Sequence, residues 1–273
     1  LIEMVAFFTD KTTVPDWLRQ HWWLFGLAGL AYATWICRPR LSVSAKLDSR
    51  DVTITIAIGD LFAFDGSIIV GTNTTFDTEI SRDLISEHSI QGQYTRRYYG
   101  DAVQLDAELS AGLASVTHEV LQGTRRGKSK RYPLGTTVRL NPREQTAYFV
   151  AIGHMNEHGN ASGTYAGLLE ALGYLWECVS QRGLKGHLVT PVLGTGFLRL
   201  TQTREEVIRE IIKSFIAACS EQTFCERLTI VLHEADVLKY HIDINRLGRF
   251  LEHVCTYTQF ADKGSASTGK AVP

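Results

Sequence analysis

The stretch SIIVGTNTTFDT, residues 67–78, decides the fold class of this chain. It begins with a short, uncharged, mostly β-branched run that reads as a buried strand, and the run ends at Gly71, Thr72 and Asn73. A continuous apolar strand of this kind is typical of a sheet that is covered by helices on both faces. Because open α/β sheets bind ligands beyond the carboxyl ends of their strands, the small-residue turn is also a candidate binding position.

Strands and helices alternate on both sides of this stretch. Thr203 and Glu206 have the spacing of a capping box, which predicts the start of a helix. Period-two or continuous apolar patterns predict strands at 52–58, 134–140, 147–153, 187–193 and 228–232, and helical periodicity predicts helices at 105–120, 161–182, 203–219 and 243–257. We therefore predict an α/β domain at 51–258, preceded by a linker at 41–50 and followed by a disordered tail at 259–273.

Composition excludes several classes of function. The chain has 273 residues, and its 28 lysines and arginines nearly balance its 29 aspartates and glutamates, giving a net charge of -1. A balanced charge disfavours a nucleic-acid partner, so any anion must be held locally. The five cysteines are odd in number and contain no Cys-x-x-Cys pair, which argues against a disulfide framework or a zinc knuckle and favours a reducing, cytoplasmic setting.

The first forty residues differ from the rest. WWLFGLAGLAYATWIC, residues 22–37, has no charged side chain, has tryptophans at both ends, and is followed by Arg38 and Arg40. We predict a transmembrane helix at about 21–37 within a membrane region at 1–40, with the following domain in the cytoplasm. Sixteen helical residues rise about 24 Å against about 30 Å of hydrocarbon, so a buried helix or a signal-peptide core stays an alternative. The apolar start of the chain suggests a truncated two-helix hairpin.

Three segments at predicted strand ends share a binding chemistry. Asp60 follows the strand at 52–58, where its carboxylate can accept a hydrogen bond from an exocyclic amine such as that of adenine. Asn73 offers both a donor and an acceptor to sugar hydroxyls. The glycine loop from Gly194 to Phe197 precedes a capped helix, and bare backbone N–H groups in such a loop bind phosphate oxygens.

These segments resemble the macro domain family, which binds ADP-ribose. The resemblance rests on Gly59-Asp60-Leu61, on the strand at 68–73 and on the loop at 191–197. It implies a macro-domain α/β/α sandwich with a mixed central sheet, Asp60 on adenine, Asn73 on the distal ribose, the glycine loop on the diphosphate and His233 against adenine. The predicted ligand-binding set is Asp60, Leu61, Gly71, Thr72, Asn73, Thr74, Phe76, Gly194, Thr195, Gly196, Phe197 and His233, with no catalytic residue, metal or cofactor.

Departures from the family pattern favour binding over catalysis. Val70 stands where the family has its first asparagine, and residues 74–79 replace the glycine-rich run that positions the scissile linkage in hydrolytic members. The alternative is a membrane-tethered ADP-ribosylhydrolase in which Asn73 and either Asp77 or Glu79 orient water. A third possibility is a reader of ADP-ribosylated protein or nucleic acid that docks through the basic run at 125–131.

Longer stretches narrow the resemblance further. VGTNTTFDTEIS, SIQGQYT, HMNEHGNASGTY and TPVLGTGFLRL, behind an apolar N-terminal segment, are similar to the membrane-anchored macro effectors of type II Thoeris anti-phage defence. That resemblance implies a partner TIR-domain enzyme that consumes NAD and makes a histidine conjugate of ADP-ribose, which the macro domain senses. It also implies a homo-oligomer that disrupts the inner membrane, with the macro domain in the cytoplasm.

Overall fold

The computed structural model divides the chain into two units, Leu1–Arg40 and Leu41–Pro273. The residues that the structure describes are 20–21, 23–36, 40–48, 50–80, 84–122, 127–156, 161–182, 186–196, 198, 200–258 and 260.

The described part of the first unit is one apolar helix, α3 (Trp23–Ile36), of 14 residues. At 1.5 Å per residue it rises about 21 Å, which is shorter than the predicted helix at 21–37 and shorter than the hydrocarbon layer. Among the described residues, no helix combines the length and the apolar character that crossing a membrane requires, so the predicted transmembrane helix is not supported here. Residues 1–19, which would hold the other helix of the predicted hairpin, lie outside the described residues.

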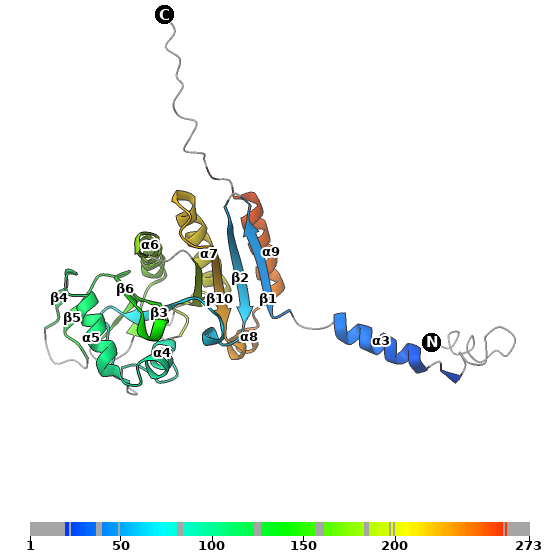
Figure 1. The fold of residues 1–273 in the computed structure, drawn as a ribbon, viewed down its shortest axis with the longest axis horizontal. Helices are drawn as coiled ribbons and strands as arrows, with labels where there is room; N and C mark the ends of the chain where they lie inside the picture. The colour runs from blue at the N-terminus through cyan, green and yellow to red at the C-terminus, as the bar shows by residue number, and fades with distance from the viewer. Residues whose placement is uncertain are drawn as a thin grey trace, which may run out of the picture. The chain divides into compact units, whose positions relative to one another are not determined.

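The second unit is built on a mixed sheet (Figure 1). Its five central strands are parallel to one another, and the strands at both edges are antiparallel to their neighbours. In spatial order the strands are β1 (Ser42–Leu47), β2 (Val52–Ile58), β10 (Arg227–Leu232), β9 (His187–Pro191), β3 (Ser67–Asn73), β7 (Ala147–Met155) and β6 (Thr137–Leu140). The short β8 (Ala161–Ser162) pairs antiparallel with the end of β7, and β4 (Glu119–Val120) pairs with β5 (Lys130–Arg131) as a separate ribbon.

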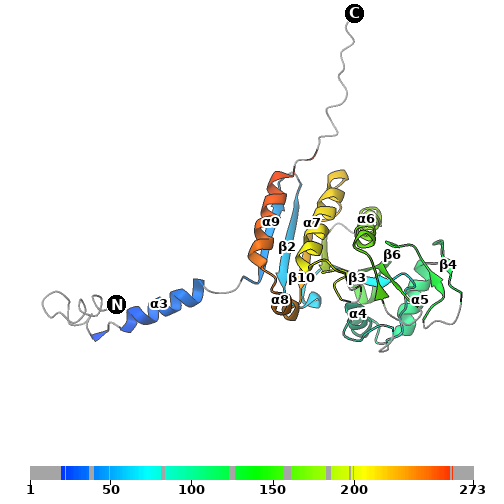
Figure 2. The ribbon, with the colours of Figure 1, turned by 180° about the vertical axis from the view of Figure 1, so that it is seen from behind.

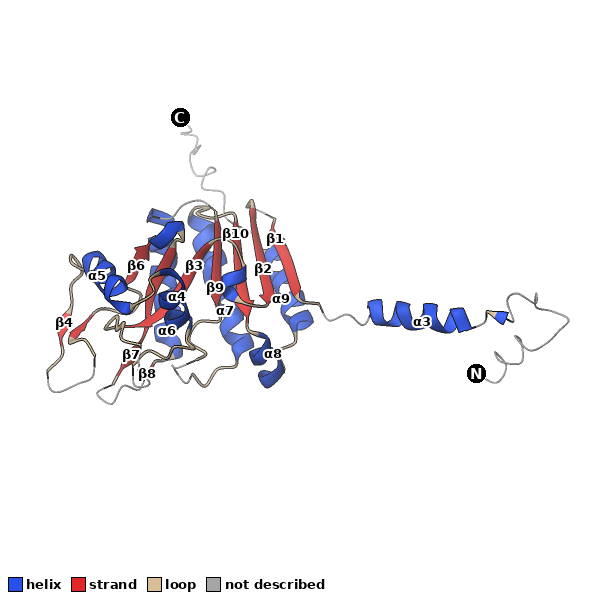
Figure 3. Ribbon diagram, turned by 60° about the horizontal axis from the view of Figure 1, so that its bottom comes forward, coloured by secondary structure: helices blue, strands red, loops and turns tan. Residues whose placement is uncertain are grey.

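Helices cover both faces of this sheet (Figures 2 and 3). Side chains alternate along β3, so that Ile69 packs into one core cluster while Ile68 and Val70 pack into the other. One face is covered by α6 (Tyr165–Arg182), α7 (Arg204–Glu221) and α9 (Ile244–Tyr257), and the other by α4 (Ile90–Tyr98) and α5 (Ala102–Gly112). The predicted three-layer α/β/α sandwich with a mixed central sheet is confirmed.

The segment predicted as a linker at 41–50 contains a strand instead. β1 pairs along its whole length with β2, from Ser42 opposite Ala57 to Leu47 opposite Val52. Leu47 has no exposed surface, and α9 packs on this edge, where Gly248 lies close to Val43. The linker prediction is therefore wrong, because these residues bury apolar surface within the second unit.

Several other element boundaries differ from the sequence prediction. The helix predicted at 105–120 ends at Gly112, where a Cβ would meet a methyl carbon of Val138 at 2.5 Å. The helices α4 and α8 (Glu234–Tyr240) and the 3-10 turns Leu61–Ala63 and Pro142–Glu144 were not predicted. Phe260, inside the predicted tail, packs against the core with Arg50 over its ring at 5.1 Å, and residues 261–273 lie outside the described residues.

Candidate functional site

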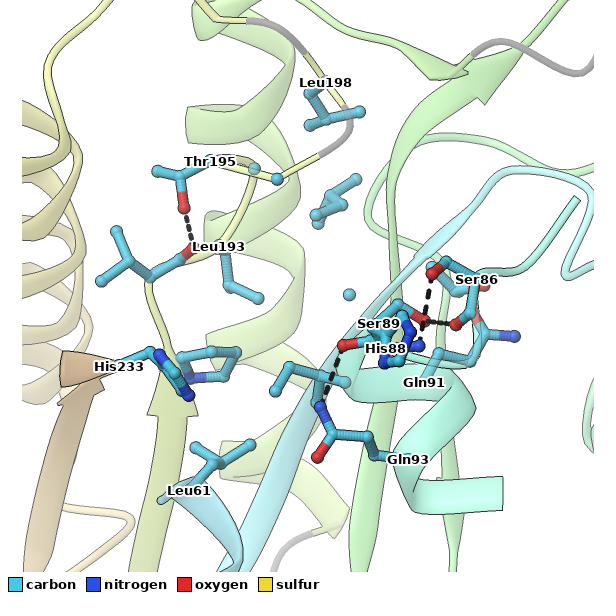
Figure 4. Close-up of a pocket in the computed structure, with 18 of the residues that line it drawn as sticks. Leu61, Ser86, His88, Ser89, Gln91, Gln93, Leu193, Thr195, Leu198 and His233 are labelled. Carbon is cyan, nitrogen blue, oxygen red and sulfur yellow. Dashed lines mark hydrogen bonds between the residues drawn. The ribbon is translucent and has the colours of Figure 1, made fainter. Parts of the chain in front are cut away.

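A cavity of about 810 Å³ lies where the parallel strands end (Figure 4). This volume is in the range of sites that bind small molecules. Its walls come from the carboxyl ends of β2, β10, β9, β3 and β7 and from the start of α4. Of the predicted site residues, the cavity is lined by Asp60, Leu61, Gly71, Thr72, Asn73, Gly194, Thr195, Gly196 and His233. Phe197 lies outside the described residues.

Asp60 stands directly after β2 and is oriented by two contacts. Its Oδ1 accepts a hydrogen bond from the backbone N–H of Phe62 at 3.0 Å, which caps the 3-10 turn. Its Oδ2 is paired with the Arg97 guanidinium of α4 at 3.3 Å, and that guanidinium also lies over the Phe62 ring. The Asp60 side chain keeps 54% of its surface exposed, so it remains able to accept a hydrogen bond from a ligand.

The glycine loop after β9 has the form of an anion site. Gly194 has φ of +76°, a conformation that L side chains rarely adopt, and the Thr195 hydroxyl donates to the carbonyl of Val192 at 2.8 Å. Among the described residues, no acceptor takes the backbone N–H of Gly194, Thr195 or Gly196. Unpaired N–H groups beside a cavity are suited to phosphate oxygens.

Asn73 lines the cavity, but its side chain is largely committed to the turn that follows β3. Its Oδ1 accepts from the N–H of Thr75 at 3.1 Å and from the N–H of Asp77 at 3.1 Å. The Thr75 hydroxyl lies 2.9 Å from the same oxygen, but its one hydrogen is shared with the closer Asp77 carboxylate at 2.5 Å. The Asn73 Nδ2 donates to the Asp77 carboxylate at 3.0 Å. Only one amide hydrogen is left for a ligand, so the main structural role of Asn73 is to hold this turn.

Thr74 and Phe76 do not line the cavity, in contrast to the sequence prediction. The Thr74 hydroxyl is 3.1 Å from Nδ1 of His154, and desolvation, with a smaller effect of Arg131, lowers the pKa of that histidine. Phe76 is fully buried with φ of 49°, and its ring meets the Tyr132 ring edge to face. Both residues therefore stabilise the buried turn after β3 and do not contact the cavity.

The start of α4 forms a wall that the sequence analysis missed. Ser89 caps this helix by accepting from the N–H of Gly92 at 3.0 Å, and its hydroxyl donates to the carbonyl of Ser86 at 2.6 Å. A Cβ at Gly92 would collide with that same carbonyl. The sequence could have indicated a helix here through Ser89 as its N-cap and Gly92 as a residue that packs closely against the preceding backbone. It could not indicate that Ser86, His88 and Gln93 face the glycine loop across the cavity (Figure 4).

Two charged cavity residues were also missed. Arg204 is the first residue of α7, and Asp236 belongs to α8. His233, which was predicted, caps α8 by accepting the N–H of Ala235 at Nδ1 over 3.2 Å. Within the described ranges, no cluster of three histidine, cysteine, aspartate or glutamate side chains could hold a metal ion.

The sheet order and the cavity at its carboxyl edge define a macrodomain. The macrodomain of Oceanobacillus iheyensis with MES bound has a TM-score of 0.52 at 13% identity, covering 80% of this chain and 100% of that chain. The same macrodomain with ADP gives 0.50 at 13% identity, covering 76% and 97%. At this level of identity the likeness is one of fold.

Comparison of the sequence identifies the family within the macrodomain fold. Residues 54–233 match the family model described as the macro domain of Thoeris protein ThsA, and the chain belongs to this family. Thoeris protein ThsA of Bacillus amyloliquefaciens (strain Y2) is 22% identical over 163 residues, which are 58% of this chain and 53% of that protein. The chain therefore spans about half the length of this curated relative.

Proposed function

We propose that this chain is a receptor in Thoeris anti-phage defence whose macro domain binds an ADP-ribose-derived signal. The observation that carries the proposal is the single cavity that joins Asp60, the glycine loop and Asn73. Family membership supports the place in Thoeris defence, and a macrodomain with ADP is among the structures of similar fold. The expected form of the signal is the histidine conjugate of ADP-ribose, made by a TIR-domain enzyme from NAD.

The order of the strands matches the order of the ligand's parts. Across the sheet the strands stand in the order β2, β10, β9 and β3. The site residues at their carboxyl ends follow the same order: Asp60 after β2, His233 after β10, Gly194 after β9 and Asn73 at the end of β3. An acceptor for the adenine amine thus comes first, unpaired N–H groups for the diphosphate come in the middle, and the turn at Asn73 comes last. This order supports ADP-ribose with its distal ribose toward β3 and β7.

The geometry favours binding over hydrolysis. Asp77, the first candidate for a water-orienting acid, is buried and accepts from Asn73, from the Thr75 hydroxyl at 2.5 Å and from the N–H of Lys128 at 2.6 Å. Neither Asp77 nor Glu79 is among the residues that line the cavity. A carboxylate held in a turn by several donors is poorly placed to take a proton from water.

Membrane anchoring and assembly belong to the same proposal. α3 contains no charged residue, and most of its large apolar side chains are exposed within its unit, including Phe25, Leu30 and Trp35. Exposed apolar surface of this extent is typical of a segment that binds a membrane or another protein. We place this segment in the inner membrane of the cell, with the macro domain in the cytoplasm and signal binding promoting formation of a homo-oligomer.

Calorimetry of the full chain in detergent, with ADP-ribose and with its histidine conjugate, tests the receptor function. We expect saturable binding of both, tighter for the conjugate, and the recovered nucleotide should be intact by chromatography. Steady release of free ADP-ribose from the conjugate would instead establish the hydrolase, and no binding of either compound would refute the receptor.

Asp60→Ala should weaken ADP-ribose binding by roughly 1.5 to 3 kcal/mol, because the adenine amine loses a charged acceptor. The dissociation constant measured by calorimetry checks this expectation. Asp51→Ala is the matched control, since Asp51 is an exposed carboxylate that pairs with Lys46 and does not line the cavity. Equal affinity of the Asp60 variant and the wild type would remove Asp60 from the site.

Substitution of Leu30 by lysine should release the chain from lipid vesicles. The exposed leucine lies in the middle of α3, where a charge in the hydrocarbon costs about 2.5 to 3.5 kcal/mol. Flotation with vesicles measures the bound fraction, and ADP-ribose affinity should not change. A variant that floats as well as the wild type would show that α3 does not anchor the chain.

A further inference from the structure

Arg204 differs from the other residues that line the cavity in its charge and its burial. It is the one lysine or arginine among the described residues that line the cavity, and only 14% of its side-chain surface is exposed. The two carboxylates in the same lining are Asp60, which is paired with Arg97, and Asp236. A ligand that carries a diphosphate would therefore bring two negative charges to a cavity with a single strong cation.

The contacts of Arg204 leave part of its donor capacity unused. Its Nη2 donates to the carbonyl of Thr195 in the glycine loop at 3.2 Å, and its guanidinium lies over the Tyr240 ring, 3.5 Å from the centroid. Its Nε is 3.4 Å from Oδ2 of Asp236, but the pair does not meet hydrogen-bond geometry, and the buried Nε has no hydrogen-bond partner in the part of the chain that the structure describes. A buried donor without a partner is costly, so this arrangement is incomplete.

The capping residues at the start of α7, beside Arg204, offer an anion few free donors. Thr203 and Glu206 form a reciprocal capping box, in which the Thr203 hydroxyl accepts the N–H of Glu206 and the Glu206 carboxylate accepts the N–H of Thr203. These donors are already used within α7. Among the described residues at this end of the cavity, the loop N–H groups and the guanidinium of Arg204 still have donor capacity for an anion.

The geometry points to Arg204 as the residue that binds the ligand's diphosphate, exchanging its ion pair with Asp236 for a phosphate oxygen. This inference rests on the proposed function, because it assumes that the ligand contains a diphosphate. The planar guanidinium matches phosphate oxygens better than an ammonium group does, and the Tyr240 ring and the Thr195 carbonyl fix its plane beside the loop. Asp236 therefore competes with the ligand for Arg204.

The first test compares Arg204→Gln with Arg209→Gln in the full chain. Arg209 lies in the same helix, stacks on Phe250 at 4.9 Å, also has a buried Nε without a partner, and does not line the cavity. We expect the Arg204 variant to bind ADP-ribose roughly ten- to a hundredfold more weakly, the cost of a lost charge-assisted hydrogen bond, and the Arg209 variant to bind within twofold of the wild type. Binding of adenosine, followed by NMR titration, should be unchanged in both, which also shows that the site is folded.

The second test is a double-mutant cycle with Asp236→Asn. We expect this variant alone to bind ADP-ribose several-fold more tightly, because Arg204 no longer has a competing partner. In the Arg204→Gln background the same change should have no effect, since Asp236 acts through Arg204. A gain that persists without Arg204 would reveal simple repulsion by Asp236 and overturn the exchange, and so would the absence of any gain in the wild-type background.

The two levels of the proposal fail in different ways. If the wild-type chain does not bind ADP-ribose, the proposed function fails before Arg204 is tested. If the wild type binds and Arg204→Gln binds equally well, the receptor stands and the role of Arg204 is refuted.

Discussion

Replacing Asn73 with alanine is expected to lower the free energy of unfolding by about 3 kcal/mol, more than a surface ligand contact would account for. The change removes the acceptor for the backbone N–H groups of Thr75 and Asp77, and it removes the amide that donates to the Asp77 carboxylate. Asp77 has only 1% of its surface exposed, so its carboxylate would lose a donor that water cannot easily replace, and unsatisfied buried groups cost about 1 to 3 kcal/mol each. Urea denaturation of the purified chain measures the loss.

Gln93→Ala is the control for this experiment. Gln93 also lines the cavity, but its amide makes one exposed hydrogen bond, to the carbonyl of His88 at 2.9 Å. Its removal should change stability by less than about 0.5 kcal/mol, as is usual for exposed polar positions. If Asn73→Ala unfolds like the wild type and only loses ADP-ribose binding, Asn73 is a ligand contact and the turn does not depend on it.

Replacing Leu47 with alanine should destabilise the second unit by roughly 2 to 5 kcal/mol, the range for removing a buried leucine side chain. Leu47 ends β1, has no exposed surface, and belongs to the core cluster under α7 and α9. A residue in a flexible linker would show almost no effect. Thermal or urea unfolding, followed by the circular dichroism of the sheet and helices, separates the two expectations.

Lys46→Ala serves as the neighbouring control. Lys46 is in the same strand, and its side chain is 63% exposed and paired with the exposed Asp51 at 2.8 Å. Exposed ion pairs contribute about 0.2 to 1 kcal/mol, so this variant should be close to the wild type in stability. Similar small losses at both positions would mean that β1 is not an integral strand of the sheet.

The sequence predicted the central strands and the large helices because their apolar patterns are long. β3, β7 and β10 have continuous apolar runs, and α7 has a capping box followed by a regular apolar face. β1 escaped prediction for a physical reason: it is an edge strand with one fully buried side chain, Leu47, and packs otherwise through the partly buried Val43 and Ala45. α4 escaped because IQGQYTRRY is polar and its attachment depends on the buried Tyr94.

The sequence predicted the site residues that lie at the ends of strands. It did not predict the residues that reach the cavity only because distant parts of the chain fold next to it. Asp60 and Gly194 follow shortly after strands, and Gly71 lies near the end of one, so a predicted parallel sheet brings them to one edge. Arg204 lines the cavity only because the chain returns there after the glycine loop. The sequence suggested that the Asn73 amide binds a sugar. The structure shows that the amide bonds to Thr75 and Asp77 in the turn, which the sequence alone could not reveal.

The pairing of β1 has a mechanical consequence. β1 enters the sheet at Ser42, opposite Ala57, and the carbonyl of Leu41 accepts the N–H of Ile58 at 2.8 Å. The first residues of this unit are therefore bonded to the end of β2, and Ile58 is only two residues before Asp60. Any tension transmitted along the backbone at Leu41 is borne first by the hydrogen bonds at that end of β2. Asp60 lines the cavity just beyond this strand end, so a ligand bound there would lie next to the hydrogen bonds that attach the start of this unit to the sheet.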